Sequence, residues 1–325
     1  MYKRYYGFDE LPFELTPNPK FLFFASRHRE ALSTLQYGLS AAKAVTVLIG
    51  EAGTGKTTLL RAALESEQCR STRCVYINNP ALNRDEFVQR LAKSFELTPQ
   101  AAASKTTLLS ELENVLAERR RHGQITALMI DEAQALSDEL LEEIRLLANI
   151  ETATEKLLPI VLAGQPELGA RLADARLRQL KQRVALRCEL VPLGLADTAA
   201  YIAARIRTAG GGDAAHVFTR EAVQAIYESS RGIPRTINVL CDNALLSGFA
   251  LDRRPVDYAI VQDVSRDFDL GAPGATSAEA AASVASERPR PPPVLGGPGA
   301  AQPMPFAETP GAGEENPQER LLHNP

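Results

Sequence analysis

Residues 50–57 read Gly50-Glu51-Ala52-Gly53-Thr54-Gly55-Lys56-Thr57, which fits the pattern G-x-x-x-x-G-K-[S/T] at every position. A short apolar run, residues 44–49, precedes this stretch, and a helical pattern begins at Lys56. In a strand–turn–helix context the glycines let backbone N–H groups turn inward around phosphate oxygens, and the helix N-terminus adds positive potential. We therefore predict a phosphate-binding loop. Lys56 is expected to reach the β- and γ-phosphates and Thr57 to coordinate Mg²⁺. The predicted nucleotide-binding residues are the eight of this loop together with Thr58.

A second motif consists of two acids, Asp131 and Glu132, at the end of the apolar run 127–130. If this run is a strand of a parallel sheet, both carboxylates lie at the carboxyl edge, where ligands bind in such folds. We expect Asp131 to hold Mg²⁺ and Glu132 to polarise the attacking water. Asp-Glu after a strand is also common at helix starts, so it is the combination with the loop at 50–57 that favours this interpretation.

The pattern of apolar residues divides the chain into two kinds of region. Strands are expected near residues 44–49, 73–77, 125–130, 158–163 and 185–190. Helices are expected from residue 56, near 84–95 and 105–121, and after Ser137. This alternation predicts an α/β fold with a parallel sheet covered on both faces. After Pro192 the expected elements are helices alone, which predicts a smaller all-helical domain with helices near 196–208, 220–230, 234–250 and 255–266.

Four regions follow from these patterns. Residues 1–40 are expected to form an aromatic segment and a helix packed on the core, with Ser26 as the helix N-cap. Residues 41–191 form the predicted nucleotide-binding core, and residues 192–270 the helical lid. Residues 271–325 hold 11 of the 21 prolines and 7 of the 21 glycines. Such a composition buries too little apolar surface to offset the entropy of ordering, so we predict a disordered tail.

Charge and composition exclude several classes of protein. Residues 1–270 contain 33 basic and 34 acidic side chains, and this balance argues against a dedicated nucleic-acid-binding surface. No apolar run approaches the roughly 18–20 residues of a membrane span, and the N-terminus lacks the apolar segment of a secretory signal. The four cysteines form no C-x-x-C pair. We expect a cytoplasmic protein, either free or attached peripherally to the inner membrane.

Three further sites carry candidate residues. Gln165 follows the strand near 158–163 and can hold the attacking water or the γ-phosphate, or can simply cap the next helix. Residues 171–187 contain five arginines, one of which can project into a neighbouring subunit's nucleotide, although an amphipathic, solvated helix explains the pattern as well. Arg235 follows Gly232-Ile233-Pro234 at the start of a lid helix, where it can touch the γ-phosphate or remain a surface side chain.

With these elements in this order, the chain resembles the AAA+ ATPases, and within them the general secretion pathway protein A (ExeA-type) family. The resemblance covers about residues 1–270 and is carried by the stretches 5–8, 12–13, 17–22, 28–32, 180–183 and 232–238. It implies a RecA-like core, a helical lid, ATP and Mg²⁺ as cofactors, and assembly into a ring or partial ring. ATP rather than GTP follows from the resemblance.

The resemblance also implies roles for individual residues. Arg183 is the expected finger that acts on a neighbouring subunit, Arg235 the sensor on the lid, and Gln165 the sensor on the core. Asn78, at the tip of the second strand, is a candidate partner that holds Glu132 idle.

Family members serve envelope export: type II secretion, pilus biogenesis, and exopolysaccharide or exosortase loci. The secretion members continue through a membrane span into a peptidoglycan-binding module, where this chain has residues 271–325. We therefore expect this chain to resemble the exopolysaccharide- and exosortase-associated ATPases more than the secretion members of the family.

Three functions remain open from the sequence. The first is an assembly ATPase for an envelope export system, with export components as partners. The second is a nucleotide-gated interaction switch with slow turnover. The third is a DNA-handling ATPase of the transposition-accessory or initiator kind, for which the arginines at 171–187 argue and the neutral charge balance argues against.

Overall fold

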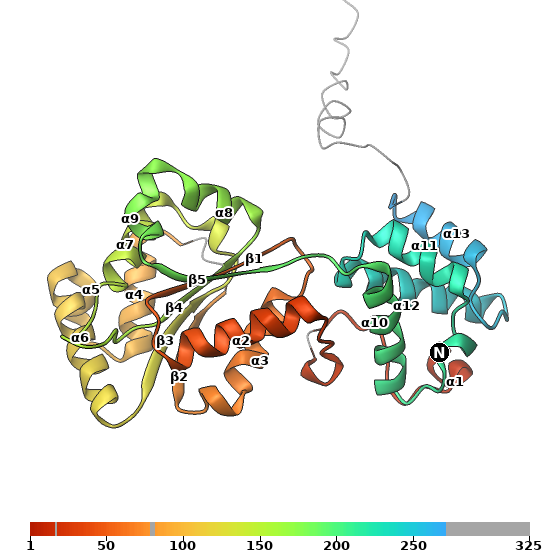
Figure 1. Ribbon diagram of the computed structural model, residues 1–325, viewed down its shortest axis with the longest axis horizontal. Helices are drawn as coiled ribbons and strands as arrows, with labels where there is room; N and C mark the ends of the chain where they lie inside the picture. The colour runs from red at the N-terminus through yellow and green to blue at the C-terminus, as the bar shows by residue number, and fades with distance from the viewer. Residues whose placement is uncertain (17, 79–81, 271–325) are drawn as a thin grey trace, which may run out of the picture. The chain divides into compact units, whose positions relative to one another are not determined.

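The computed structural model describes residues 1–16, 18–78 and 82–270, and a five-stranded parallel sheet lies within residues 45–190 (Figure 1). The strands lie in the order β2-β3-β4-β1-β5, and every neighbouring pair is parallel. Their bounds are β1 Val45–Gly50, β2 Thr72–Ile77, β3 Ile125–Ile130, β4 Ile160–Gly164 and β5 Val184–Leu190. The predicted parallel α/β sheet is confirmed. Because β1 lies between β4 and β5, the loop that follows it emerges beside the tip of β4.

Helices cover both faces of this sheet, so its three central strands, β1, β3 and β4, are buried along their whole length. Within β1, Val47 and Ile49 belong to one apolar cluster and Leu48 to another. The first cluster contains side chains of α4 (Arg84–Phe95), α6 (Lys105–Arg121) and α7 (Asp138–Leu147). The second contains side chains of α2 (Ser26–Ser40) and α3 (Lys56–Glu65), which cover the other face in Figure 1. The short helices of this region are α5 (Pro99–Ala103), α8 (Pro166–Ala173) and α9 (Arg178–Lys181).

Local capping fixes where several helices begin. The Asn83 side chain accepts from the backbone N–H of Glu86 while the Glu86 carboxylate accepts from that of Asn83, a reciprocal cap at the start of α4. Ser26 is the first residue of α2 and Ala25 is its N-cap, with no side-chain bond. The predicted Ser26 cap is therefore wrong by one residue.

The lid consists of α10 (Leu195–Thr208), α11 (Arg220–Ser230), α12 (Pro234–Ala250) and α13 (Tyr258–Asp267), as the pattern of the sequence predicts. The last helix starts later than expected because the Asp257 side chain caps it, accepting from the backbone N–H of Ile260.

The aromatic N-terminal segment packs on the lid, so the expectation that it packs on the core is corrected. Helix α1 (Tyr2–Tyr6) and the rings that follow it are buried among lid side chains. Tyr6, Phe8 and Phe13 each have at most 4% of their surface exposed. The physical reason is that these rings complete the apolar cluster between the lid helices, whereas α2 buries Leu35 and Leu39 against the sheet.

Two sequence expectations concern the remaining parts of the chain. Among the described residues, none of the helices combines the length and apolar character that crossing a bilayer requires. The predicted disorder of residues 271–325 lies outside the described residues.

Candidate active site

The predicted phosphate loop joins β1 to α3 at the carboxyl edge of the sheet. Gly53 and Gly55 have φ values of 82° and 98°, a left-handed backbone that side-chain-bearing residues rarely adopt. Gly55 is also the N-cap of α3. The Thr54 side chain is buried, and its hydroxyl donates to the carbonyl of Glu51 over 2.8 Å. The Thr54 backbone N–H donates to the same carbonyl over 3.3 Å. Two glycines and these two internal hydrogen bonds thus fix the turn.

Lys56 folds back over this loop. Its Nζ donates to the carbonyl oxygens of Gly50 at 2.8 Å and of Glu51 at 3.0 Å, and the residue is 5% exposed. Burial lowers the pKa of the Lys56 ammonium, and the nearby carboxylates of Glu132 and Asp131 oppose that shift. The two carbonyls are neutral acceptors. A phosphate oxygen that replaced them would form stronger, charge-assisted bonds, so the lysine fits an anionic ligand.

Thr57 and Asp131, the two predicted metal ligands, are in direct contact. The Thr57 Oγ1 donates to Asp131 Oδ2 over 2.5 Å, and Asp131 is 1% exposed. The Tyr76 hydroxyl donates to the same carboxylate oxygen over 2.9 Å. A hydroxyl and a carboxylate side by side are oxygen ligands of the kind that Mg²⁺ takes beside substrate phosphates. Tyr76, whose pKa is raised by burial and by the Asp131 charge, had no motif that marked it.

Glu132 is held by two amide side chains. Its backbone has a φ of 55°, and its Oε2 accepts from Gln134 Nε2 at 2.6 Å and from Gln165 Nε2 at 3.3 Å. Gln134 is oriented in turn, because its Oε1 accepts from the backbone N–H of Gln165 over 3.0 Å. Gln165 is the N-cap residue of α8, but its side chain makes no cap hydrogen bond. The structure therefore places Gln165 on Glu132, and it adds Gln134, which the sequence reasoning missed.

Asn78 lies elsewhere. It is exposed directly after the end of β2 and makes no hydrogen bond to Glu132 in the part of the chain that the structure describes. The amides that hold the Glu132 carboxylate come instead from the segment after β3 and from the tip of β4.

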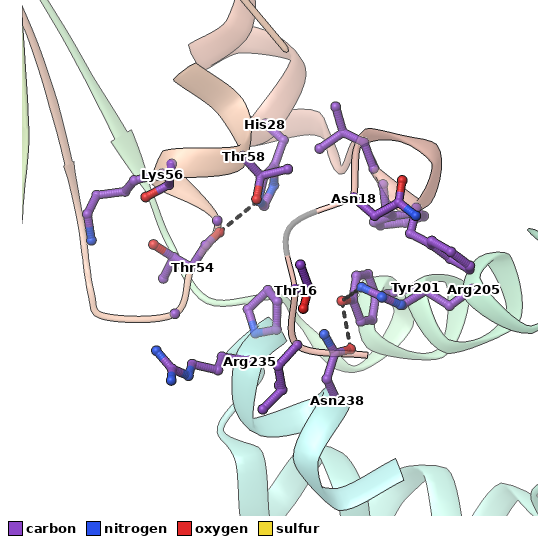
Figure 2. A pocket seen from close by; sticks show the side chains of 18 of the residues that line it. Thr16, Asn18, His28, Thr54, Lys56, Thr58, Tyr201, Arg205, Arg235 and Asn238 are labelled. Atoms are coloured by element: carbon purple, nitrogen blue, oxygen red, sulfur yellow. Dashed lines mark hydrogen bonds between the residues drawn. The ribbon is translucent and has the colours of Figure 1, made fainter. Parts of the chain in front are cut away.

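The lid meets the phosphate loop directly. The backbone N–H of Arg235 donates to the carbonyl of Gly53 over 3.2 Å, and a Cβ at Gly53 would lie 2.7 Å from that of Arg235. Figure 2 shows the Arg235 side chain extending from α12 to the loop. A cleft of about 360 Å³ lies here, between the loop, the lid and the N-terminal segment. Its lining includes Thr16, Asn18, Phe21, Phe23, His28, residues 53–58, Glu132, Leu193, Tyr201, Arg205, Arg235 and Asn238.

His28, on α2, also faces this cleft and was not predicted as a site residue. Its Nε2 lies 3.2 Å from the carbonyl oxygen of Thr54, so this nitrogen carries the proton and Nδ1 is left as an acceptor. The Nδ1 atom is buried with no hydrogen-bond partner among the described residues. Burial lowers the pKa of His28, which favours the neutral ring that this arrangement requires.

Comparison with known proteins shows the family of the chain. Residues 40–172 match the family described as AAA domain. Over 250 residues the chain is 40% identical to the general secretion pathway protein A of Aeromonas hydrophila. This chain is an AAA+ P-loop NTPase of the general secretion pathway protein A type. The match takes in 77% of this chain and 45% of the relative, so the chain spans less than half the length of that protein.

Solved structures show the same AAA+ fold. The ORC2 protein of Aeropyrum pernix, solved as ADPNP-ADP complexes, has a TM-score of 0.60 at 16% identity, covering 84% of this chain and 74% of that one. Cdc6p of Pyrobaculum aerophilum has a TM-score of 0.59 at 18% identity, covering 79% and 70%. At such identities the likeness concerns the fold alone.

The predicted finger of this AAA+ chain, Arg183, lies at the opposite end of the sheet from the phosphate loop. It precedes the first residue of β5, Val184, and its side chain is exposed. Arg171 and Arg176 form ion pairs within the chain, whereas the described residues supply no ion pair for Arg178 or Arg183. The structure thus separates the arginines that are engaged locally from those that are available to a neighbour.

Proposed function

We propose that this AAA+ chain hydrolyses ATP with Mg²⁺. The observation that carries the proposal is the 2.5 Å contact between Thr57 Oγ1 and Asp131 Oδ2, beside the buried ammonium of Lys56. These side chains come from separate motifs, and together they supply a cation and two oxygen ligands at one edge of the sheet. That combination suits a nucleoside triphosphate with its metal ion.

The residues divide the chemistry among them. Lys56 binds the β- and γ-phosphates, and Thr57 and Asp131 would hold Mg²⁺, which when bound neutralises charge on the phosphate oxygens. Glu132 takes a proton from the attacking water while the water oxygen bonds to the γ-phosphorus. The bond between the γ-phosphorus and the β–γ bridging oxygen breaks, which leaves ADP and phosphate. Because Oε2 of Glu132 already accepts from two amides, Oε1 is the oxygen left to receive this proton.

We further propose that turnover energises or regulates an envelope export system of the type II secretion-like, pilus, or exopolysaccharide and exosortase kind. The support is the 40% identity to general secretion pathway protein A, although the match takes in only 45% of that protein. A ring or partial ring of this chain, cytoplasmic or attached peripherally to the inner membrane, with export components as partners, is part of this proposal.

Glu132→Gln tests the enzymatic part, because it keeps the shape of the side chain and removes its basicity. We expect at least a hundredfold loss of Mg²⁺-dependent turnover with ATP still bound, whereas Lys56→Ala should abolish ATP binding. Turnover is measured at several protein concentrations. A Glu132→Gln variant that hydrolyses ATP as fast as the unaltered chain would refute the role of Glu132.

The contact between lid and loop favours a second candidate, a nucleotide-gated switch with slow turnover. The hydrogen bond from Arg235 N–H to Gly53 O links the loop to the first turn of α12. In a switch, lid position would differ between ATP and ADP while hydrolysis without a partner stays slow. Fast turnover of the isolated chain favours the ATPase instead.

A DNA-handling role has weaker support. ORC1 of Aeropyrum pernix, solved in complex with DNA, has a TM-score of 0.59 at 17% identity, which concerns the fold alone. Salt-dependent DNA binding at about 50 mM salt would revive this role, since phosphate contacts release counterions.

A further inference from the structure

Three buried polar side chains of the lid form a hydrogen-bonded network beside the nucleotide cleft. Arg205 Nη1 donates to the Tyr201 hydroxyl over 2.7 Å, and that hydroxyl donates to Asn238 Oδ1 over 2.8 Å. Arg205, Tyr201 and Asn238 are 8%, 6% and 7% exposed. All three line the cleft that contains the phosphate loop.

The buried guanidinium of Arg205 in this network has no carboxylate partner among the described residues. Arg205 donates instead to the backbone carbonyls of Pro12 at 2.5 Å and of Glu14 at 3.3 Å. Its guanidinium also lies over the rings of Phe21, at 4.9 Å, and Tyr201, at 5.5 Å. Burying an arginine is costly, and these contacts hold it in one position while it fastens the N-terminal wall of the cleft.

The direction of the hydrogen bonds fixes the orientation of the Asn238 amide. Arginine can only donate, so the Tyr201 oxygen accepts and its single hydrogen is left for Asn238 Oδ1. Asn238 Nδ2 is then the free end of the amide, and it makes no hydrogen bond to any residue that the structure describes. Figure 2 shows this nitrogen on the side of Asn238 that faces Thr16, inside the cleft.

The surroundings of this nitrogen suit a flat heterocycle. Phe21, Phe23, Leu193 and Tyr201 contribute aromatic and apolar surface to the cleft, and the phosphate loop lies along the same cleft. A planar base packs well against such side chains, and its ring nitrogens are acceptors that match an N–H donor.

We propose that Asn238 donates from Nδ2 to a ring nitrogen of the adenine base, and that Tyr201 and Arg205 are positioning residues that set this donor. The inference rests on the proposed binding of ATP. It adds a residue that determines base specificity, in a position that no phosphate-binding motif marks.

The test compares ATP with analogues in which one ring nitrogen is replaced by C–H: 1-deaza-, 3-deaza- and 7-deaza-ATP. Each competes with a fluorescent ATP for the full chain in Mg²⁺. We expect one analogue to bind the unaltered chain roughly three- to tenfold more weakly than ATP, the worth of one hydrogen bond. That penalty should vanish in Asn238→Ala and shrink in Tyr201→Phe.

Asn243→Ala is the matched control, because Asn243 lies on the same helix, bonds to the carbonyl of Val239 and lines an adjoining cavity whose lining does not include Asn238. It should keep the full penalty. If Asn238→Ala does not fold, Asn238→Asp replaces the donor by an acceptor of the same shape and should bind ATP more weakly than the analogue.

Analogue penalties that are the same in the Asn238 variants and the unaltered chain would overturn the inference. 2′-Deoxy-ATP is measured alongside the deaza analogues. If Asn238→Ala removed only the penalty for 2′-deoxy-ATP, the inference would also be overturned, since Asn238 would then contact the ribose. Failure of the proposed function looks different: the unaltered chain would not bind ATP, or would bind it without Mg²⁺-dependent turnover.

Discussion

Arg183→Ala should abolish turnover without weakening ATP binding by the single chain. Strands β1 and β5 are parallel and pair Val45 with Val184 at one end and Gly50 with Leu190 at the other. Arg183 therefore lies next to the start of β1, while the phosphate loop follows its end. At about 3.3 Å per residue, the five steps from Val45 to Gly50 separate them by about 17 Å, more than an arginine side chain spans. Arg183 therefore cannot reach the phosphate loop of its own chain, and the proposed finger role requires the nucleotide of a neighbouring chain.

The size of the effect follows from what such a finger does. A guanidinium that neutralises charge on the transferring phosphate contributes about 10³–10⁵ in rate, or roughly 4–7 kcal/mol of the barrier. The assay is Mg²⁺-dependent hydrolysis as a function of protein concentration, with fluorescent ATP binding measured in parallel. Arg176→Ala is the matched control, because it removes another exposed arginine that is engaged within the chain by Asp138 and Asp174. It should leave the rate within a few-fold of the unaltered chain.

Mixing two inactive variants tests the trans geometry directly. Lys56→Ala chains keep Arg183, and Arg183→Ala chains keep the nucleotide site. In a head-to-tail assembly mixed at equal amounts, about one quarter of the interfaces pair an intact site with an intact finger. Turnover should therefore return to about a quarter of the normal value per site. No rescue at any ratio, with both variants still assembling, would refute the trans role of Arg183.

Three further predictions concern residues around the loop. Tyr76→Phe removes a donor from the carboxylate that would hold Mg²⁺, so the Mg²⁺ concentration for half-maximal turnover should rise about tenfold; no rise would contradict this. Gln134→Ala removes one hydrogen bond to the Glu132 carboxylate, so kcat should fall about 10²-fold at an unchanged KM. An unchanged kcat would mean that the carboxylate needs no such support. Gly53→Ala places a Cβ at positive φ against Arg235, so thermal unfolding should show a loss of about 1–2 kcal/mol, and equal stability would mean that the loop relaxes freely.

The parts of this structure that the sequence predicts are those where a local pattern sets a local conformation. The bounds of α4, α6, α11 and α12 agree with the expected ranges, because helical periodicity and end signals lie within each segment. The phosphate loop is similar, since Gly53 and Gly55 occupy the two left-handed positions that require glycine. The packing of the N-terminal rings is different. A run of aromatic residues signals burial, but which surface it covers depends on where the lid helices leave an apolar gap.

The residues that hold Glu132 show why the rest of the site is hidden from sequence. Glu132 follows β3, and its partners come from Gln134, two residues on, and from Gln165 at the tip of β4, which pairs with β3 in the sheet. The strand order that joins these segments is set by packing over the whole sheet, and no spacing in the sequence encodes it. The family resemblance suggests Asn78 as the partner of Glu132, and β2 does pair with β3, yet the described contacts on Glu132 come from Gln134 and from the β4 side. Because Gln134 bonds to both Glu132 and the backbone of Gln165, it links the tip of β4 to the carboxylate that we propose as the base.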